Sequence, residues 1–419
     1  MRLFSLPGRL VRSAVMRDID LFQAALGLSP PFVVERCALD VDKKQLDLWV
    51  DFPRGSRFAC AGCGRTGCAV HDSVEQTWRH LDFFQYKAFL HCRVARSHCA
   101  DCGVLKVKAP WARAGSGFTL LFEAMLLAMV KHMPVGVVAR MVDEHDTRLW
   151  RVLEHYIGKA LDAMDLSQLR QIAVDETSAR RGHDYVSLFV DLAQRRVVYA
   201  GDGKGAETVE EFGAWLEDHC GARDRISDVS MDMSAAFVSG VRKTFPRAKI
   251  TFDKFHVIQL VNRAVDEVRR QERRTNPLLK GARYIFLKNK DNLTHAQRLR
   301  LAALEGANLD TLQAWQIRIN LQDVFDRPSA ASARRFLQTW NAWVQTSGLK
   351  PMMKAAKTIM QRAGDILRSI ETGLSNGVME AINANVQAAK RKAKGYRTKR
   401  NLKMIIYLTA GHVLDRLPT

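Results

Sequence analysis

The stretch that decides the fold is QIAVDETSARRGHDYVSLFVDLAQRRVVYAGDG, residues 171–203. It contains three apolar runs, at 171–178, 184–192 and 195–203, which are separated by turn-forming residues. Short apolar runs with such boundaries are typical of β-strands. We therefore predict three consecutive strands in this stretch.

The residues that follow extend these strands into a mixed α/β domain. ETVEEFGAWLEDHC (207–220) and SAAFVSGVRKTFP (234–246) have helical spacing, whereas ISDVSMDMS (226–234) and AKITFDKFHV (248–257) are predicted strands. The resulting order, β-β-β-α-β-α-β, is that of an RNase H-like core, a mixed sheet with helices on its faces. We assign the first part of this core to residues 169–258.

Two aspartates in this core are candidate metal ligands. Asp175 follows the apolar run IAV, and Asp232 follows DVSM. A charge at a buried strand is costly unless it is paired or bound to a cation, so two such positions on different strands predict a shared metal site. Hard cations such as Mg²⁺ (or Mn²⁺) prefer oxygen ligands, and two of them can support phosphodiester cleavage. A third carboxylate from elsewhere would complete the site.

Glu380 is the candidate for that third carboxylate. It is the one acid in LSNGVMEAINANVQAAKRKAKGYRTKR, residues 374–400, which contain seven bases. A helix from Ser375 or Asn376 to Gly395 would let the acid bind metal while bases on the same face hold the DNA backbone. Alternatively, Glu380 is an ordinary exposed glutamate that pairs with a nearby lysine. The residues expected to share its face are Asn383 or Ala384, Gln387, Arg391 and Lys394.

The cysteines predict a structural zinc site. Six of the eight lie between residues 60 and 102, and the pairs Cys60/Cys63 and Cys99/Cys102 are two C-x-x-C motifs, each followed by glycine. Four thiolates complete a tetrahedral zinc site, whereas a redox motif needs one pair and a reducing cytosol disfavours disulfides. The segment between the pairs is predicted to contain an inserted hairpin. Four neighbouring residues could replace a ligand but are better interpreted as ordinary side chains: Cys68, Cys92, His71 and His98.

The region around the zinc motif divides into two further modules. Residues 31–52 alternate apolar and polar positions around the turn DKKQ, which predicts a hairpin that leads into a zinc-ribbon-like module, residues 1–116. Residues 117–168 have helical spacing with a break at Pro134, which suggests a helix-turn-helix whose third helix is capped by Thr147 or Asp146. This helix would present Arg148 and Arg151 to DNA. The alternative is a plain helical spacer.

The charge of the chain favours a polyanionic partner. There are 64 Lys and Arg residues against 44 Asp and Glu residues, a net charge of +20, and residues 254–370 alone hold 21 bases and 9 acids. Clustered positive charge favours double-stranded DNA through counterion release. A membrane surface is disfavoured because no basic amphipathic helix stands out. We expect a soluble intracellular chain in which 259–371 is a helical insertion and 372–419 a final core helix with a basic tail.

The sequence resembles the ISL-three (ISL3) family of bacterial insertion-sequence transposases, which belong to the DDE group. The resemblance rests on the paired C-x-x-C motifs and on VDETSARRGHDYVSLFVDL (174–192), VSMDMSAAFVSGVRKTFPRAKITFDKFHV (229–257) and SNGVMEAINANVQAAKRKAKGYR (375–397). It implies an RNase H-like domain that cuts transposon ends and joins them to new DNA with Mg²⁺, in a bacterial cytoplasm and associated with the nucleoid. One departure is Val386-Gln387, where the family pattern suggests Ile-Lys.

The resemblance also implies specific roles for individual residues. The catalytic triad falls on Asp175, Asp232 and Glu380, and Asp253 and His256 match a C/D-x-x-H motif, which makes them secondary candidates. The implied DNA-binding residues of the C-terminal helix and tail are Lys390, Arg391, Lys394 and Arg397.

These features support three functions. The leading one is a DDE transposase that binds terminal inverted repeats and acts as a homodimer or larger oligomer, because two ends must be handled together. The alternative is a non-catalytic DNA-binding regulator derived from a transposase, for which the triad is dispensable. A third is a structure-specific nuclease that cuts without joining.

Overall fold

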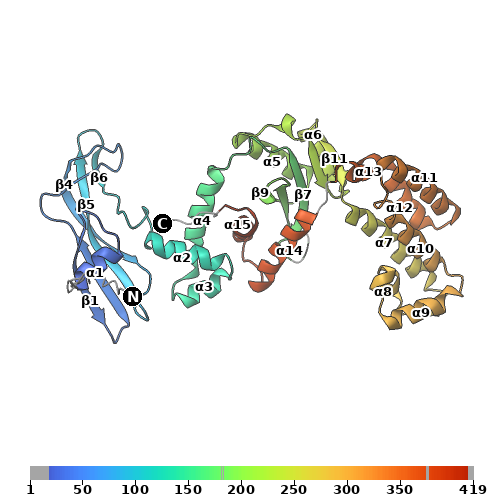
Figure 1. The fold of residues 1–419 in the computed structure, drawn as a ribbon, viewed down its shortest axis with the longest axis horizontal. Helices are drawn as coiled ribbons and strands as arrows, with labels where there is room; N and C mark the ends of the chain where they lie inside the picture. Colours follow the sequence, from blue (N-terminus) through green and yellow to red (C-terminus); the bar gives the residue numbers. More distant parts are fainter. Residues whose placement is uncertain (1–17, 181, 183, 374–376, 414–419) are drawn as a thin grey trace, which may run out of the picture. The chain divides into compact units, whose positions relative to one another are not determined.

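The computed structural model describes residues 18–180, 182, 184–373 and 377–413, which form two compact units (Figure 1). Unit 1 contains the described residues up to 132 together with 138–144. Unit 2 contains residues 133–137 and the described residues from 145 onward. Within the described part of the chain, no helix is both long enough and apolar enough to cross a lipid bilayer.

Unit 1 is built on a six-stranded sheet. The strand order is β1-β2-β5-β4-β3, with β6 paired to β5, and its inner face is lined by apolar side chains such as Leu48, Trp78 and Leu90. The predicted hairpins at 31–52 and between the two C-x-x-C motifs are both present as antiparallel pairs. The elements of this sheet and the helix before it are α1 (Asp18–Ala25), β1 (Val33–Asp40), β2 (Gln45–Asp51), β3 (Arg57–Phe58), β4 (Cys68–Arg79), β5 (Lys87–Cys99) and β6 (Gly103–Lys106).

Three helices follow where three were predicted: α2 (Leu120–Val130), α3 (Val135–Met141) and α4 (Asp146–Asp162). Thr119 caps α2, accepting a hydrogen bond from the Phe122 N–H. The predicted cap of α4 is wrong, because the helix already includes Asp146 and Thr147. The ring nitrogen of His145 accepts a hydrogen bond from the Thr147 N–H instead. Asp146 then lies in the first turn, where a negative charge favours the helix dipole.

Unit 2 contains a five-stranded sheet of order β11-β10-β7-β8-β9. The first three strands along the chain pair antiparallel, whereas β10 pairs parallel to β7 and β11 pairs parallel to β10. Helices α5 and α6 lie on one side of the sheet, and α14 and α15 lie on the other (Figure 1). The bounds are β7 (Gln171–Ser178), β8 (Tyr185–Asp191), β9 (Arg196–Asp202), α5 (Ala206–Asp218), β10 (Asp228–Met231), α6 (Ala235–Thr244) and β11 (Lys249–Phe252).

One prediction for this sheet was wrong in detail. The strand predicted at 171–178 is confirmed as β7, so Asp175 lies within it. The predicted strand 248–257 ends at Phe252, because the carboxylate of Asp253 accepts a hydrogen bond from the Phe255 N–H and caps the next helix. The sequence KFHV is therefore the start of a helix.

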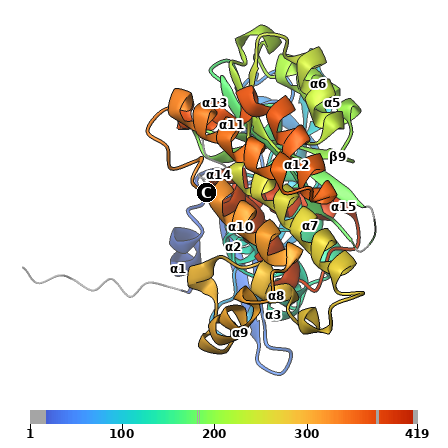
Figure 2. The ribbon, with the colours of Figure 1, turned by 90° about the vertical axis from the view of Figure 1, so that its right-hand side faces the viewer.

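The helical insertion predicted at 259–371 is present and extends over residues 254–372, and its helices α10 and α12 both pack against α7 (Figure 2). Its apolar side chains and those of the sheet form one continuous hydrophobic core, which includes Phe252, Ile359 and Leu367. Trp315 belongs to this core, and its Nε1 donates to the Lys288 carbonyl. The helices are α7 (Lys254–Glu272), α8 (Arg283–Phe286), α9 (His295–Glu305), α10 (Asp310–Gln322), α11 (Ala330–Thr346), α12 (Lys350–Gln361) and α13 (Ala363–Thr372).

The last two helices of unit 2 return to the sheet. Helix α14 (Gly377–Lys392) packs on β7, and α15 (Lys399–Ala410) packs on the edge strand β9. The proposed start of α14 at Ser375 or Asn376 lies outside the described residues. The predicted end at Gly395 is three residues too late. The chain leaves the helix at Lys392, and the Gly395 N–H donates to the Lys390 carbonyl with φ at +97°, which glycine adopts readily.

Candidate metal and nucleic-acid sites

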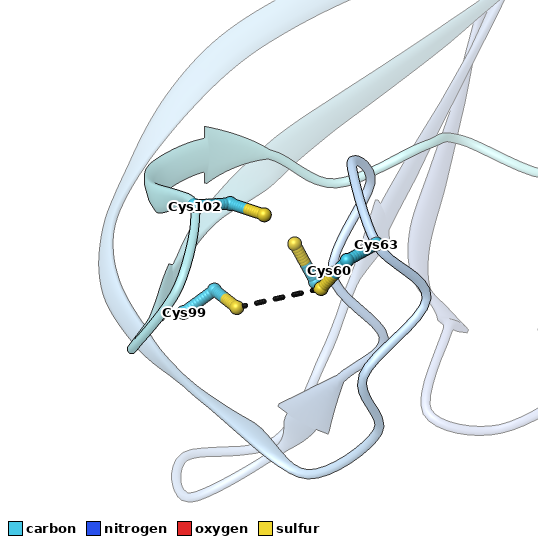
Figure 3. A group of neighbouring side chains, drawn as sticks. All are labelled: Cys60, Cys63, Cys99 and Cys102. Atoms are coloured by element: carbon cyan, nitrogen blue, oxygen red, sulfur yellow. Dashed lines mark hydrogen bonds between the residues drawn. The ribbon is translucent and has the colours of Figure 1, made fainter.

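The four cysteines of the two C-x-x-C motifs converge on one point of unit 1 (Figure 3). Their sulfur atoms all lie within 4.8 Å of one another, and the Cys63 and Cys99 sulfurs are 3.7 Å apart. A tetrahedral site with zinc–sulfur bonds of about 2.3 Å places its sulfurs about 3.8 Å apart. Gly64 and Gly103, directly after the motifs, have φ values of +79° and +73°, which explains the glycine at each position. The predicted structural zinc site is confirmed.

The electrostatics of these thiols suit a dication. Backbone N–H groups of Asp101 and Cys102 point at the Cys99 sulfur and lower its pKa to about 6. Hydrogen bonds with the Cys63 and Cys60 sulfurs favour the protonated Cys102 thiol and, together with burial and the charges of these sulfurs, raise its pKa to about 12. Four thiolates this close require a cation that neutralises them, and Zn²⁺ supplies that charge.

The four alternative ligands lie outside the cluster. Cys68 is buried beside the cluster, but its thiol donates to the Arg65 carbonyl. Cys92 is buried in the core of the sheet, which raises its pKa to about 12. His71 faces Asp72, and His98 is exposed on β5.

Unit 2 brings Asp175 and Asp232 to one pocket of ≈ 580 Å³. In the parallel pairing of β7 and β10, Ser230 is opposite Ala173, so two residues further along each strand Asp232 is level with Asp175. The Asp175 carboxylate accepts from the Glu176 N–H, and that of Asp232 accepts from the Ser234 N–H. The other residues that line the pocket are Glu176, Tyr185, Met233, Ser234, His256, Gln259, Leu260, Arg263 and Thr358.

The carboxylates of this pocket carry excess negative charge. Burial raises the pKa of Asp175, and the charges of Asp232 and Asp253 raise it further, while His256 and the Glu176 N–H lower it. Burial also raises the pKa of Glu176, with Lys204 opposing. A bound cation would lower the free-energy cost of ionising such acids. A polar pocket lined by them is therefore a candidate cation site.

Helix α14 contacts Asp175 through Asn383 rather than through Glu380. The Asn383 Nδ2 donates to Asp175 Oδ2 at 2.6 Å. Glu380 lies one turn earlier and is exposed, and neither Glu380 nor Asn383 is among the residues that line the pocket. Among the residues that the structure describes, the three acids of the predicted triad do not have oxygens that all lie within 4.8 Å of one another.

The secondary candidates have separate positions. His256 lines the pocket, whereas Asp253 is buried and caps α7, with 3.9 Å between its Oδ2 and the His256 Nε2. Gln259 and Arg263 share the His256 face of α7 at helical spacing and also line the pocket. Neither residue was predicted, because DKFHV was assigned to a strand. Their i, i+3, i+7 spacing from His256 is the helical signal that could have identified them.

The predicted DNA-binding residues lie on α4 and around the end of α14. Arg151 is exposed and Arg148 half-buried on α4. The Lys390 Nζ donates to the Ser178 carbonyl at 2.6 Å, so this base, and not Arg391, continues the β7-facing side of α14. Lys394 lies beyond the helix, which corrects the prediction that it shares the Glu380 face. Arg391, Lys394 and Arg397 are exposed.

Comparison with known families defines the class of protein to which these parts belong. Residues 172–406 match a family described as transposase, and residues 107–157 match the helix-turn-helix domain of transposase family ISL3. Residues 56–102 match the zinc-finger of transposase IS204/IS1001/IS1096/IS1165. The class is therefore a transposase with its own zinc-binding and helix-turn-helix modules. The chain belongs to the ISL3 family of transposases.

Curated relatives agree with this assignment. The chain is 28% identical over 357 residues to the transposase for insertion sequence element IS1001 of Bordetella parapertussis, which covers 82% of this chain and 87% of that protein. It is 27% identical over 438 aligned positions to the transposase for insertion sequence element IS1557 of Mycobacterium tuberculosis, which covers 95% of this chain and 97% of that protein. The similarity therefore extends over nearly the whole chain.

Proposed function

We propose that this chain is a DDE transposase of a bacterial insertion sequence, with an RNase H-like catalytic domain in unit 2. The sheet order β11-β10-β7-β8-β9, antiparallel in its first three strands along the chain and parallel in its last two, supports this domain assignment. The enzyme binds terminal inverted repeats, cleaves the DNA at the transposon ends and joins the freed 3′ ends to target DNA. It works in the cytoplasm, on the nucleoid, as a dimer or larger assembly that handles two ends together.

The observation that carries this proposal is the meeting of Asp175 and Asp232 in one pocket on adjacent parallel strands. Their oxygens suit Mg²⁺ or Mn²⁺, and a bound cation would offset the cost of ionising Asp175, whose pKa is raised by burial and by the neighbouring acids. Divalent ions bound there would supply charge neutralisation for the attacking and leaving oxygens of an in-line displacement. The role of the two carboxylates is to hold those ions at fixed positions.

Glu380 completes the triad in this proposal after a movement of the start of α14. It precedes Asn383 by three residues, which corresponds to about 4.5 Å along the helix axis. A rearrangement of the first turn of α14, with Asn383 kept on Asp175, brings its carboxylate to the same cations. We expect DNA and cations together to cause this rearrangement, because they remove the electrostatic cost of a third carboxylate beside Asp175.

DNA contacts in this proposal come from three parts of the chain. The zinc module and α4, with Arg148 and Arg151, recognise the inverted repeats. The bases around the end of α14, Lys390, Arg391, Lys394 and Arg397, hold the phosphate backbone near the cleavage site.

The test is a strand-transfer assay with Mg²⁺ on a DNA substrate that carries the inverted repeats flanking the gene. Asp175→Asn, Asp232→Asn and Glu380→Gln should each reduce cleavage and joining at least 100-fold and leave end binding within a fewfold of the wild type. Glu371→Gln, which changes another exposed acid before α14, is the matched control and should retain activity. Equal loss of binding and cleavage in the three triad variants would contradict the assignment, and cleavage without joining would indicate a nuclease.

The second candidate is a non-catalytic DNA-binding regulator. It is favoured by one observation, the exposed position of Glu380 outside the pocket. It predicts full end binding with no Mg²⁺-dependent product from the wild type, so the same assay separates the two functions.

A further inference from the structure

Among the residues that the structure describes, Asn383 joins α14 to a predicted catalytic aspartate. Its Nδ2 donates to Asp175 Oδ2 at 2.6 Å, a short distance for a contact between an amide and a carboxylate. Gln387 and Lys390 make two further polar contacts with β7, at Thr177 and at the Ser178 carbonyl. These contacts fix the register of the helix along the strand.

The other end of the Asn383 amide is unsatisfied. Its Oδ1 is buried and has no hydrogen-bond partner among the residues that the structure describes. A buried acceptor left in this state destabilises the folded protein. Such an atom beside an acidic pocket calls for a donor or a cation.

The register places Asn383 at the level of both aspartates. It contacts Asp175, and the parallel pairing of β7 with β10 makes Asp232 level with Asp175. Any cation held by the two aspartates therefore lies near the Asn383 amide. Side-chain amide oxygens are accepted ligands of hard divalent cations.

We propose that Asn383 contributes its Oδ1 to the oxygen shell of the divalent cation held by Asp175 and Asp232. This inference rests on the proposed function. Asn383 is then a fourth protein ligand in addition to the Asp175, Asp232 and Glu380 triad.

An asparagine at this position can meet the needs of the site both without a cation and with a cation bound. Without a cation, the negative Asp175 needs a donor, which Nδ2 supplies. With a cation, the same side chain needs to present an oxygen. The terminal torsion of asparagine has broad energy wells, so rotation of the amide exchanges the two atoms at low cost. An aspartate can supply the oxygen alone, and a leucine of similar size can supply neither atom.

The test is Mn²⁺ binding to the full zinc-loaded chain, measured by the electron paramagnetic resonance signal of free Mn²⁺ and by melting in chelator-free buffer without added Mn²⁺ or Mg²⁺. Asn383→Leu should weaken Mn²⁺ binding by roughly tenfold or more, as loss of a supporting ligand does. Asn383→Asp should bind Mn²⁺ at least as tightly as the wild type. Without added Mn²⁺ or Mg²⁺, however, it should melt at a lower temperature, because it adds a carboxylate beside Asp175.

The matched control is Gln387→Leu, which removes the neighbouring contact to Thr177 from the same helix face. It should lower the melting temperature without changing Mn²⁺ affinity. Wild-type affinity in Asn383→Leu would overturn the inference, as would an Asn383→Asp variant as weak as Asn383→Leu, because the amide would then act only as a donor. Asp175→Asn separates this failure from failure of the proposed function. If the wild type shows no Mn²⁺ binding that Asp175→Asn removes, both are wrong.

Discussion

At the residue scale, Asp175 lies in a negatively charged and partly buried environment. Burial raises its pKa, and Asp232 and Asp253 add to the effect. The folded protein therefore binds this proton more tightly than the unfolded chain does. By linkage, the stability of the cation-free protein falls as the pH rises from the ordinary pKa of 3.8 through the raised folded value.

Asp175→Asn should consequently stabilise the cation-free protein. In chelator-free buffer without added Mg²⁺ or Mn²⁺ at pH 7, we expect its melting temperature to rise by roughly 2 °C, the shift that about 1 kcal/mol produces in a unit of this size. The gain should vanish as the pH falls below 3.8, where the carboxyl group becomes protonated in both states. Calorimetry across this pH range measures both effects.

The control for this prediction is Asp165→Asn. The Ser167 N–H lowers the pKa of Asp165, so its carboxylate is favoured by folding and its removal should bring no gain at pH 7. A rise in both variants would show that the effect is not specific to the acidic pocket.

The zinc ligands allow a second test at this scale. Cys99→Ser should reduce the zinc content from about one ion per chain to near zero and unfold the surrounding loops, because structural zinc contributes directly to folding. Cys68→Ser is the matched control, because Cys68 is buried beside the same cluster but its thiol donates a hydrogen bond to the Arg65 carbonyl. It should retain its zinc, as measured by elemental analysis. Loss of zinc from Cys68→Ser to the same extent would contradict the ligand set.

Residue types with strict chemical requirements were predictable from the sequence. The four cysteines follow from spacing, and Asp175 and Asp232 follow from the cost of charge at apolar strands. Asn383 was named only as a face-sharing neighbour of Glu380, because the contact to Asp175 depends on the register of α14 against β7. The pattern of side chains along the sequence does not show that register, because the register is set by contacts between residues more than 200 positions apart.

At the element scale, α4 is the predicted DNA-reading helix. Arg151 is exposed near its start, and Lys159 is exposed in its last turn. In a helix-turn-helix the first turns of the third helix enter the groove, so the two bases should differ in effect.

Arg151→Ala should weaken binding to the transposon end by roughly 1–3 kcal/mol if it reads a base, and reduce the slope of log affinity against log salt by about one if it contacts a phosphate. Lys159→Ala should leave both quantities close to the wild type. Fluorescence anisotropy over a range of salt concentrations measures them. The same loss in both variants would indicate a general charge effect and contradict a specific role for α4.

Element boundaries were the part of the fold that the sequence specified least well. The apolar spacing of FDKFHV suits a strand, but the Asp253 cap starts α7 and brings His256 to the pocket. Likewise, α14 ends at Lys392, three residues before Gly395, because the chain turns there and the Gly395 N–H donates back to the Lys390 carbonyl. In both cases one hydrogen bond from a cap or a turn outweighs a weak periodic preference.

At the scale of the whole molecule, the helical insertion is part of the same unit as the candidate site. Its core side chains are continuous with those of the five-stranded sheet, and the Arg368 guanidinium of α13 pairs with Asp228 on β10. Thr358 of α12 lines the same pocket as the aspartates. The insertion thus supplies one wall of the candidate site, and we propose that the 21 bases of residues 254–370 contact DNA.

Anomalous X-ray scattering from Mn²⁺, in a crystal of the full chain bound to its cleaved transposon end, measures most directly where the cation sits. We predict a peak at about 2.0–2.4 Å from oxygens of both Asp175 and Asp232, with the Glu380 carboxylate moved to the same ion or to a second one beside it. A cation bound elsewhere, or Glu380 still one turn away in the loaded complex, would contradict the account.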